Sequence, residues 1–331
     1  MTNTSRTINS SITLSVTTII TVLALTGCQT MTTGKAVSNN SMTSNPLTAQ
    51  MPVIDRQGRI AYVEEQGVGA AKISTLYSIS PDGSDRRLID QLNGYIYAPA
   101  WSADGQHLAY SKQPARHYPF IYIYDRSKQS SELVVDAKGS NLSPSFSPDG
   151  LRLLYSSSVG GNADIYERSL TTGITKQLTT LSSTEVQPSY APDGQSFVYV
   201  SDKVRSGRPS IYRYTFATGN AALLSANGYA ASPQLSLDGQ LMSYLNGRQA
   251  AVITLANKQV VNLAETGLDE PARFSPSAQY VVYAMQNSKI NGQTGSSLVV
   301  RSLASGSSYI ISSKLGNSQS HSLVRSPVWG R

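Results

Sequence analysis

Side chains with metal-binding or nucleophilic chemistry are few and scattered in this sequence. The histidines are His107, His117 and His321, and no two of them have metal-ligand spacing. The only cysteine is Cys28, which precedes the body of the chain. A Gly-x-Ser-x-Gly nucleophile elbow is absent, and the glycine pairs lack a Walker or dinucleotide-binding context. The sequence therefore predicts no catalytic residue, no metal site and no cofactor, and we expect that the protein is not an enzyme.

Recurrent aspartates are the next candidates for chemistry. Asp104, Asp149, Asp193 and Asp238 each stand alone in an Asp-Gly pair, at spacings of 45, 44 and 45 residues. A calcium loop needs several oxygen ligands within one short segment. Turn formation is therefore the better interpretation of these residues. Asp269–Glu270 is an adjacent acidic pair that precedes an expected inner strand. It is interpreted as a solvated loop, with a position facing a central channel as the alternative.

A repeat of about 45 residues sets where these side chains lie. Residues 99–110, 144–155, 188–199 and 233–244 align without gaps, and residues 272–283 form a fifth copy that has lost its Asp-Gly pair. Each copy predicts a short apolar strand, an Asp-Gly hairpin turn and a second strand that ends in tyrosine. A period of this length is typical of the four-stranded blades of a β-propeller.

The two ends of the repeat array predict how the propeller closes. Residues 58–62 match the second strand of a blade without an inner strand before them, and residues 327–329 match an inner strand without a second strand after them. If the C-terminal strand completes the first blade, the ring closes and exposed sheet edges disappear. The predicted fold is therefore an all-β, six-bladed β-propeller; an open solenoid is the alternative. The second strands end at Tyr62, Tyr110, Tyr155, Tyr199, Tyr244 and Tyr283.

The first residues are expected to be a targeting sequence for the cell envelope. Residues 1–27 resemble a signal peptide, with an apolar region from Ile12 to Leu25 that is too short to span a bilayer. Leu25-Thr-Gly-Cys28 resembles the lipobox of bacterial lipoproteins, which implies lipid attachment at Cys28. Gln29 in place of aspartate favours the outer membrane. Residues 28–55 are polar and aperiodic, which predicts a flexible tether, and residues 56–331 are expected to form the propeller.

The formal net charge of +7 allows two interpretations. It describes either a solvated basic surface or attraction to an anionic partner such as envelope glycan, lipid head groups or an acidic protein. Nucleic acid is not an expected partner, because the basic residues form no run and match no reading motif.

Several segments resemble the TolB-like β-propeller family, whose namesake is the periplasmic component of the Tol–Pal envelope system. Ser201-Asp-Lys203 followed by residues 207–212 resembles one blade of that family. Residues 59–63 and 326–329 resemble the start and the end of its propeller. The similarity covers about residues 56–330. We expect the chain to differ from TolB proteins in carrying a lipobox, and in having a tether where those proteins have an α/β domain.

This resemblance implies a function in binding. We expect a monomeric, periplasm-facing lipoprotein of the outer membrane that binds an envelope protein and contacts the membrane only through its lipid anchor. The family partner is the peptidoglycan-associated lipoprotein Pal. The alternative is a propeller that binds or processes envelope carbohydrate.

The partner is expected to dock on one particular face. In a propeller, the loops that enter the inner strands and the loops that join second to third strands share a face, opposite the Asp-Gly turns. Variable loops on a rigid scaffold are where recognition usually resides. The candidate residues of this face are Tyr97, Asn141, Gln187, Ser232, Glu270 and Arg325 in the entering loops, and Lys203, Arg205 and Arg208 in the joining loops.

Overall fold

The structure is a computed structural model that describes residues 57–204, 206–225, 228–287, 295–315 and 322–331. The predicted signal peptide, Cys28 and the predicted tether lie outside the described residues, as do Arg205 and His321. Within the described ranges almost all regular structure is β-strand, apart from one short 3₁₀ turn at Gly69–Ala71. No helix in the described ranges has the length and hydropathy needed to cross a membrane.

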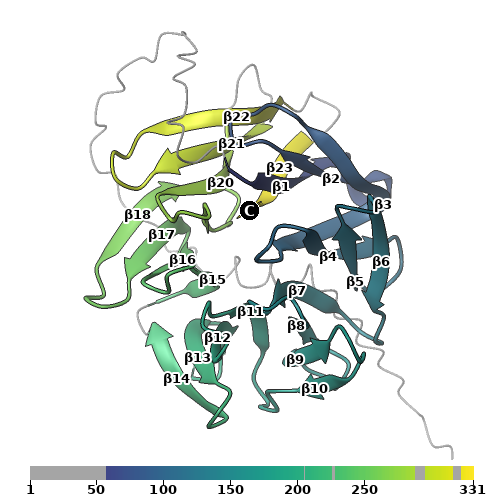
Figure 1. Cartoon of the computed structure of the whole chain (residues 1–331), viewed down its shortest axis with the longest axis vertical. Helices are drawn as coiled ribbons and strands as arrows, with labels where there is room; N and C mark the ends of the chain where they lie inside the picture. The colour runs from purple at the N-terminus through teal and green to yellow at the C-terminus, as the bar shows by residue number, and fades with distance from the viewer. Residues whose placement is uncertain (1–56, 205, 226–227, 288–294, 316–321) are drawn as a thin grey trace, which may run out of the picture. The chain divides into compact units, whose positions relative to one another are not determined.

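The strands form six blades around a central axis, as the repeat predicted (Figure 1). Each blade is antiparallel, and neighbouring strands in the sheet are mostly consecutive in the chain. Blade 1 contains β23 (Ser322–Gly330), β1 (Arg59–Gln66), β2 (Ile73–Ile79) and the first half of β3 (Arg87–Trp101). Blade 2 contains the second half of β3, then β4 (His107–Pro114), β5 (Phe120–Asp125) and β6 (Ser130–Val135).

The remaining four blades are separate four-stranded sheets. Blade 3 is β7 (Asn141–Phe146), β8 (Arg152–Ser157), β9 (Asp164–Ser169) and β10 (Thr175–Gln177). Blade 4 is β11 (Glu185–Tyr190), β12 (Ser196–Ser201), β13 (Ser210–Thr215) and β14 (Asn220–Ser225). Blade 5 is β15 (Ala230–Leu235), β16 (Leu241–Asn246), β17 (Gln249–Thr254) and β18 (Val260–Glu265). Blade 6 is β19 (Arg273–Phe274), β20 (Tyr280–Gln286), β21 (Gly295–Ser302) and β22 (Ser308–Leu315).

The predicted ring closure is confirmed. The last strand, β23, lies antiparallel to the first strand, β1, and supplies the inner strand that blade 1 lacks (Figure 1). The two strands approach closely at their ends, where a Cβ atom on Gly58 would lie 1.9 Å from the carbonyl oxygen of Gly330. Gly58 also has a φ of +86°, a conformation that glycine adopts without a steric penalty.

Blades 1 and 2 share one strand, which the repeat did not predict. Strand β3 pairs with β2 through its first half and with β4 through its second half. The change of blade occurs at Gly94, whose φ is +141°. A Cβ atom there would lie 2.2 Å from the carbonyl oxygen of Gln113, so only glycine fits the crossing.

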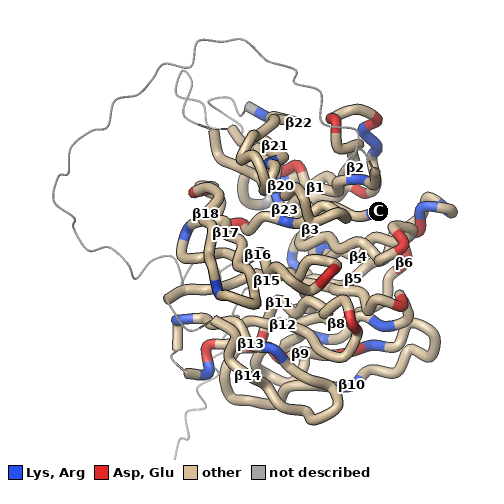
Figure 2. Tube along the Cα trace, turned by 60° about the vertical axis from the view of Figure 1, so that its left-hand side comes forward, with Lys and Arg blue, Asp and Glu red and all other residues tan. Residues whose placement is uncertain are grey.

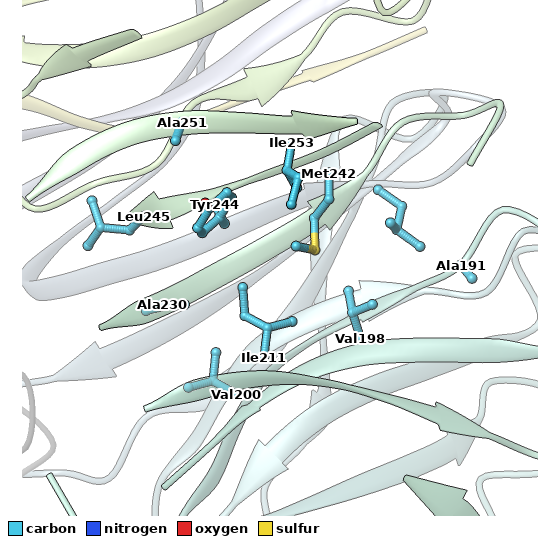
Figure 3. Close-up of a cluster of buried hydrophobic side chains, with 12 residues drawn as sticks. Ala191, Val198, Val200, Ile211, Ala230, Met242, Tyr244, Leu245, Ala251 and Ile253 are labelled. Atoms are coloured by element: carbon cyan, nitrogen blue, oxygen red, sulfur yellow. The ribbon is translucent and has the colours of Figure 1, made fainter. Parts of the chain in front are cut away.

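The hydrophobic core lies between the blades. Six clusters of buried apolar side chains each join two neighbouring blades around the ring. In the cluster between blades 4 and 5, Val198 and Ile211 pack towards Met242 and Ile253 (Figure 3). The second strands run two to four residues past the recurrent tyrosines, so the prediction that they end there is wrong. All six tyrosines are buried, as an inter-blade packing role requires.

The Asp-Gly turns are held by their own aspartates. In blade 5, the Ser236 hydroxyl donates to Asp238 Oδ1 at 2.6 Å, and the backbone N–H of Gln240 donates to the same oxygen at 3.0 Å. The hydroxyl of Ser236 lowers the pKa of Asp238 below its ordinary value. Asp104 and Asp149 make the same pair of contacts in blades 2 and 3. The turn interpretation of these aspartates is therefore confirmed.

Candidate functional site

The strand directions divide the loops between two faces of the propeller. The loops that enter the inner strands and those that join second to third strands lie together, on what we call the loop face. The Asp-Gly turns lie at the opposite ends of the same strands, on the turn face. The loop face carries Tyr97, Asn141, Gln187, Ser232, Glu270 and Arg325 near the axis, and Lys203 and Arg208 further out.

Five of the six inner strands bulge just after they leave the loop face. The residue before a proline adopts a left-handed conformation in five of the six blades: Ala98, Ser143, Gln187, Ser232 and Ser326 have φ between 45° and 55°. All five positions coincide with register shifts in the pairing of the inner strand. Such bulges bend a strand and redirect its side chains and backbone groups. They turn backbone N–H and C=O groups towards the neighbouring blade.

Glu270 joins blade 6 to blade 1 through such a bulge. Arg325 donates to Glu270 Oε1 at 2.8 Å, and the backbone N–H of Ser326 donates to Glu270 Oε2 at 2.7 Å. Glu270 is only 8% exposed, whereas the neighbouring Asp269 keeps its carboxylate half in solvent. The solvated-loop interpretation is therefore wrong for Glu270, which is fixed by an ion pair. The charge of Glu270 raises the pKa of Arg325, so this guanidinium stays charged at neutral pH.

A second link joins blades 4, 5 and 6. The backbone N–H of Ser232 donates to the Gln187 side-chain oxygen at 2.8 Å, and Arg273 donates to the Ser232 carbonyl at 2.9 Å. The backbone N–H and the backbone carbonyl of Ser232 thus each bind a side chain from a neighbouring blade. Burial lowers the pKa of Arg273 to about 10, which still leaves the guanidinium charged at neutral pH. We call Gln187, Ser232, Glu270, Arg273 and Arg325 the inner rim.

An aromatic and charged cluster continues the inner rim into blades 1 and 2. The rings of Tyr95 and Tyr97 stack with centroids 5.6 Å apart, and the Lys72 ammonium lies 4.5 Å from the Tyr95 centroid. Lys72 also donates to Glu65 at 2.8 Å, and Glu65 lies 3.9 Å from Arg325. Burial raises the pKa of Tyr97, so its hydroxyl is protonated at any physiological pH. The cluster offers flat aromatic surface beside paired charges.

Asn141 lies on the loop face but is fully buried. Its amide nitrogen donates to the Ala137 carbonyl at 2.7 Å, and its side-chain oxygen accepts from Ser157 at 2.8 Å. Asn141 therefore holds the loop that enters β7, and a partner would not reach its side chain in this conformation.

Glu185 occupies the equivalent position in blade 4, three residues before the proline of the inner strand. Sequence reasoning missed it, although the repeat alignment with Asn141 marks the position. Glu185 is fully buried, and Oε1 accepts from Ser183 at 2.6 Å and from Ser201 at 2.8 Å. Burial raises the pKa of Glu185, and the negative charge of Asp164 in blade 3 adds to this effect. Burial likewise raises the pKa of Asp164.

The joining loops surround the inner rim with exposed basic and apolar side chains. Lys203 and Arg208 are both exposed, and the Lys203 ammonium lies 3.9 Å from the centroid of the Tyr212 ring. Charged residues are sparse along the strands themselves (Figure 2). Loops of the loop face in blades 1 to 4 also present large apolar side chains that are at least 44% exposed: Val68, Tyr118, Val159, Leu181 and Val204.

In the described part of the chain, no group of three histidine, cysteine, aspartate or glutamate side chains could hold a metal ion. What the loop face does offer is aromatic surface, exposed cations and apolar side chains at the tips of its loops. Such an arrangement suits the recognition of a macromolecular surface.

Comparison with known proteins identifies the family. Residues 47–330 match the TolB beta propeller domain, PD40. The chain belongs to this family. The Tol-Pal system protein TolB of Francisella tularensis subsp. mediasiatica is 29% identical over 246 residues, which is 70% of this chain and 55% of the relative. The chain thus spans about half the length of the curated TolB relatives it matches.

Solved TolB structures share the architecture. The crystal structure of TolB from Acinetobacter baumannii matches with a TM-score of 0.71 and 32% identity, over 83% of this chain and 67% of that one. A putative TolB from Agrobacterium tumefaciens has the same fold, with a TM-score of 0.61, 19% identity and coverage of 82% and 99%. The six-bladed propeller predicted from the repeat and the TolB-like family implied by the resemblance are therefore confirmed.

Proposed function

We propose that this protein is a protein-binding propeller of the bacterial envelope, related in role to the Tol–Pal system, and that its partner docks on the loop face. One observation carries the proposal. The loop face combines an inner rim fixed by inter-blade hydrogen bonds with outer loops that expose apolar and basic side chains. Binding sites of this kind need a rigid base and accessible contact residues.

The rigidity of the inner rim comes from bonds that cross between blades. Gln187, Ser232 and Arg273 link three successive blades, and Glu270 links the sixth to the first. A partner that meets these groups would find them already ordered, so little side-chain entropy would be lost on binding. Tyr95 and Tyr97 add stacked aromatic surface next to this base, and tyrosine is enriched in binding hot spots.

The outer loops provide the features that attract a partner. Lys203 and Arg208 are exposed cations in one joining loop, and Val68, Val159 and Val204 are exposed apolar tips on three separate loops. Scattered apolar residues of this kind are ordinary when they stand alone. Their position around a fixed rim, together with basic neighbours, favours an acidic protein surface as the partner.

The family suggests which partner to test first. The matched relatives are named as Tol-Pal system proteins, so a peptidoglycan-associated lipoprotein is the leading candidate. We further propose that lipid attachment at Cys28 holds the chain at the outer membrane, facing the periplasm, and that residues 28–55 act as the tether. The proposed role is binding, without a catalytic step or a cofactor.

The test is a pull-down from solubilised envelopes with the full chain as bait, run beside a screen of immobilised envelope glycans. We expect capture of an envelope protein, confirmed by direct titration with the purified candidate. Glycan binding without a protein partner would overturn the proposal in favour of the carbohydrate-binding alternative. A bait with Lys203→Glu and Arg208→Glu serves as the matched variant, because both side chains are exposed on the loop face.

A further inference from the structure

A cleft of about 340 Å³ lies on the turn face between blades 1 and 2, away from the loop face. The shared strand β3 lines both sides of it, with Arg87 at the start of the strand and Trp101 at its end. Arg59, Tyr124 and Arg126 also line the cleft, from the start of β1 and the end of β5. Its volume lies near the lower end of the roughly 300–1,000 Å³ range of small-molecule sites.

The cleft carries surplus positive charge. Three arginines and no acidic residue are among the described residues that line it. Just outside, the Asp85 carboxylate pairs with Arg59 at 2.7 Å and with Arg87 at 2.8 Å. The Arg126 guanidinium makes no ion pair with a described residue and donates one hydrogen bond, to the Gly105 carbonyl at 2.9 Å. Asp85 therefore offsets one of three positive charges.

Two of the three guanidinium groups remain able to bind a ligand. Arg59 is buried and fully engaged. Arg87 uses Nε and Nη2 in its contacts with Asp85, but its side chain is 58% exposed and Nη1 makes no hydrogen bond within the described part of the chain. Arg126 is half-buried. Arg126 uses only Nη1 in its bond to Gly105, so Nε and Nη2 make no hydrogen bond within the described part of the chain. The planar arginine fork matches the oxygen atoms of carboxylates and phosphates, and such charge-assisted bonds are the strong ones.

Part of the cleft wall is apolar or aromatic, beside the arginines. Trp101 and Tyr124 are aromatic, the side chain of Leu88 is 60% exposed, and the Arg126 guanidinium carbon lies 6.0 Å from the Trp101 ring. A small ion alone would leave this surface unused. A molecule with a ring or short apolar body would cover it, while its anionic group met Arg87 and Arg126.

We propose that this cleft is a second binding site, which takes the phosphate or carboxylate group of a small ring-bearing molecule. Arg87 and Arg126 bind the anionic group, and the buried Arg59 adds a fixed positive charge beside them. The aromatic side chains that line the cleft contact the ring. The site is independent of the partner that docks on the loop face.

Calorimetric titration of the full chain with phenyl phosphate and glucuronate tests this inference, with phenol and glucose as the matched neutral compounds. We expect at least one of the anions to bind with a dissociation constant below about 10 mM, and the neutral compounds not to bind in this range. Tighter binding of phenyl phosphate would identify a phosphate ligand, and tighter binding of glucuronate would identify an acidic sugar. Inorganic phosphate should bind more weakly than phenyl phosphate if the aromatic walls contribute.

Variants locate the binding. Arg87→Gln and Arg126→Gln should each weaken it on the order of 10-fold, because each removes a charge-assisted hydrogen bond. Arg126→Lys keeps the charge but loses the fork, so it should fall between the parent and Arg126→Gln. Arg248→Gln is the control, since Arg248 is an exposed arginine in a joining loop of blade 5, far from the cleft. Equal binding of the neutral compounds, no binding of either anion, or unchanged binding in both glutamine variants would overturn the proposal.

Discussion

Trp329 in the last strand is the direct antiparallel partner of Ile60 in the first strand. Both side chains are buried in the cluster that joins blade 6 to blade 1. The Trp329 indole N–H also donates to the Gln57 carbonyl at 3.3 Å. This one pair therefore belongs at once to the closing sheet of the ring and to an inter-blade core.

Removing residues 324–331 should destroy the closure. The deletion strips blade 1 of its inner strand and exposes the edge of β1, so we expect aggregation or a large fall in the melting temperature. The point variant Trp329→Ala should cost about 3–5 kcal/mol of unfolding free energy through the cavity it leaves. Thermal and urea unfolding measure both effects. Deletion of the exposed Arg331 alone is the control, and a truncated chain that melts like the parent would contradict the closed ring.

Replacing Glu185 by glutamine should make stability less dependent on pH. The folded protein raises the pKa of Glu185 above its ordinary value near 4.5, so folding favours the protonated form. The parent is therefore most stable, as far as this group is concerned, below pH 4.5, and loses that contribution as the pH rises through the raised pKa. Glutamine cannot ionise and should lose nothing over this window.

Urea unfolding of the parent and of Glu185→Gln between pH 4 and pH 8 checks this expectation. The stability of the variant relative to the parent should increase towards the alkaline end. Glu132→Gln is the matched control, because Glu132 is exposed on the outer strand of blade 2. Parallel pH profiles for the parent and Glu185→Gln would contradict the role of burial.

Asp238→Asn should destabilise its turn more than Asp193→Asn does in the neighbouring blade. Asp238 accepts from both a serine hydroxyl and a backbone N–H, whereas blade 4 has Ala191 in the place of the serine, so Asp193 accepts only the backbone bond from Gln195. We expect a difference of about 1 kcal/mol in unfolding free energy, since hydrogen bonds to charged groups are stronger than neutral ones. Equal losses in the two variants would show that the serine contributes nothing.

Charge reversal of Lys203 together with Arg205 should weaken binding of the envelope partner. The effect should fall mainly on the association rate, on the order of 10-fold at low salt, and the salt dependence should decrease with it. Surface plasmon resonance at two salt concentrations measures both. Substitutions of Gln106 and Gln195, beside Asp-Gly turns on the turn face, are the controls. Sensitivity to these glutamines together with indifference to the cations would mean that the partner uses the turn face.

Cys28→Ala should abolish acylation and leave the precursor uncut by the lipoprotein signal peptidase. Incorporation of radiolabelled palmitate into the parent and the variant measures this directly. Substitution of a nearby tether residue, such as Ser38→Ala, should leave labelling unchanged. Equal labelling of Cys28→Ala and the parent would refute the lipoprotein assignment.

The fold could be predicted from the sequence because its signals are local and repeated. Asp-Gly turns at fixed intervals, each followed by a strand that contains a buried tyrosine, define the blades without any long-range information. The shared strand β3 was not predicted, because the crossing at Gly94 depends on how closely the backbone of Gln113 approaches it. That approach exists only in the assembled sheet.

The candidate site could be predicted only in part. The repeat predicted which residues lie on the loop face, because the order of strands in a blade determines the direction of each strand. The ion pair of Glu270 with Arg325 joins residues 55 positions apart, and the contact of Gln187 with Ser232 depends on bulges that bring neighbouring blades together. From its repeat position, Asn141 was expected to face a partner like the other residues of the entering loops. Its side chain is instead buried by its own loop. Side-chain burial in a loop is decided by packing, which spacing alone does not reveal.

The position of β1 between two partner strands has a mechanical consequence. Its hydrogen bonds to β23 on one side and β2 on the other run across the strand, so tension applied along β1 strains both ladders together. A pull transmitted through the residues that precede Gln57 thus meets shear resistance from two sides, and peeling away one neighbour still leaves the other attached. Extracting β1 therefore requires more hydrogen bonds to break than extracting a strand that is paired on one side only.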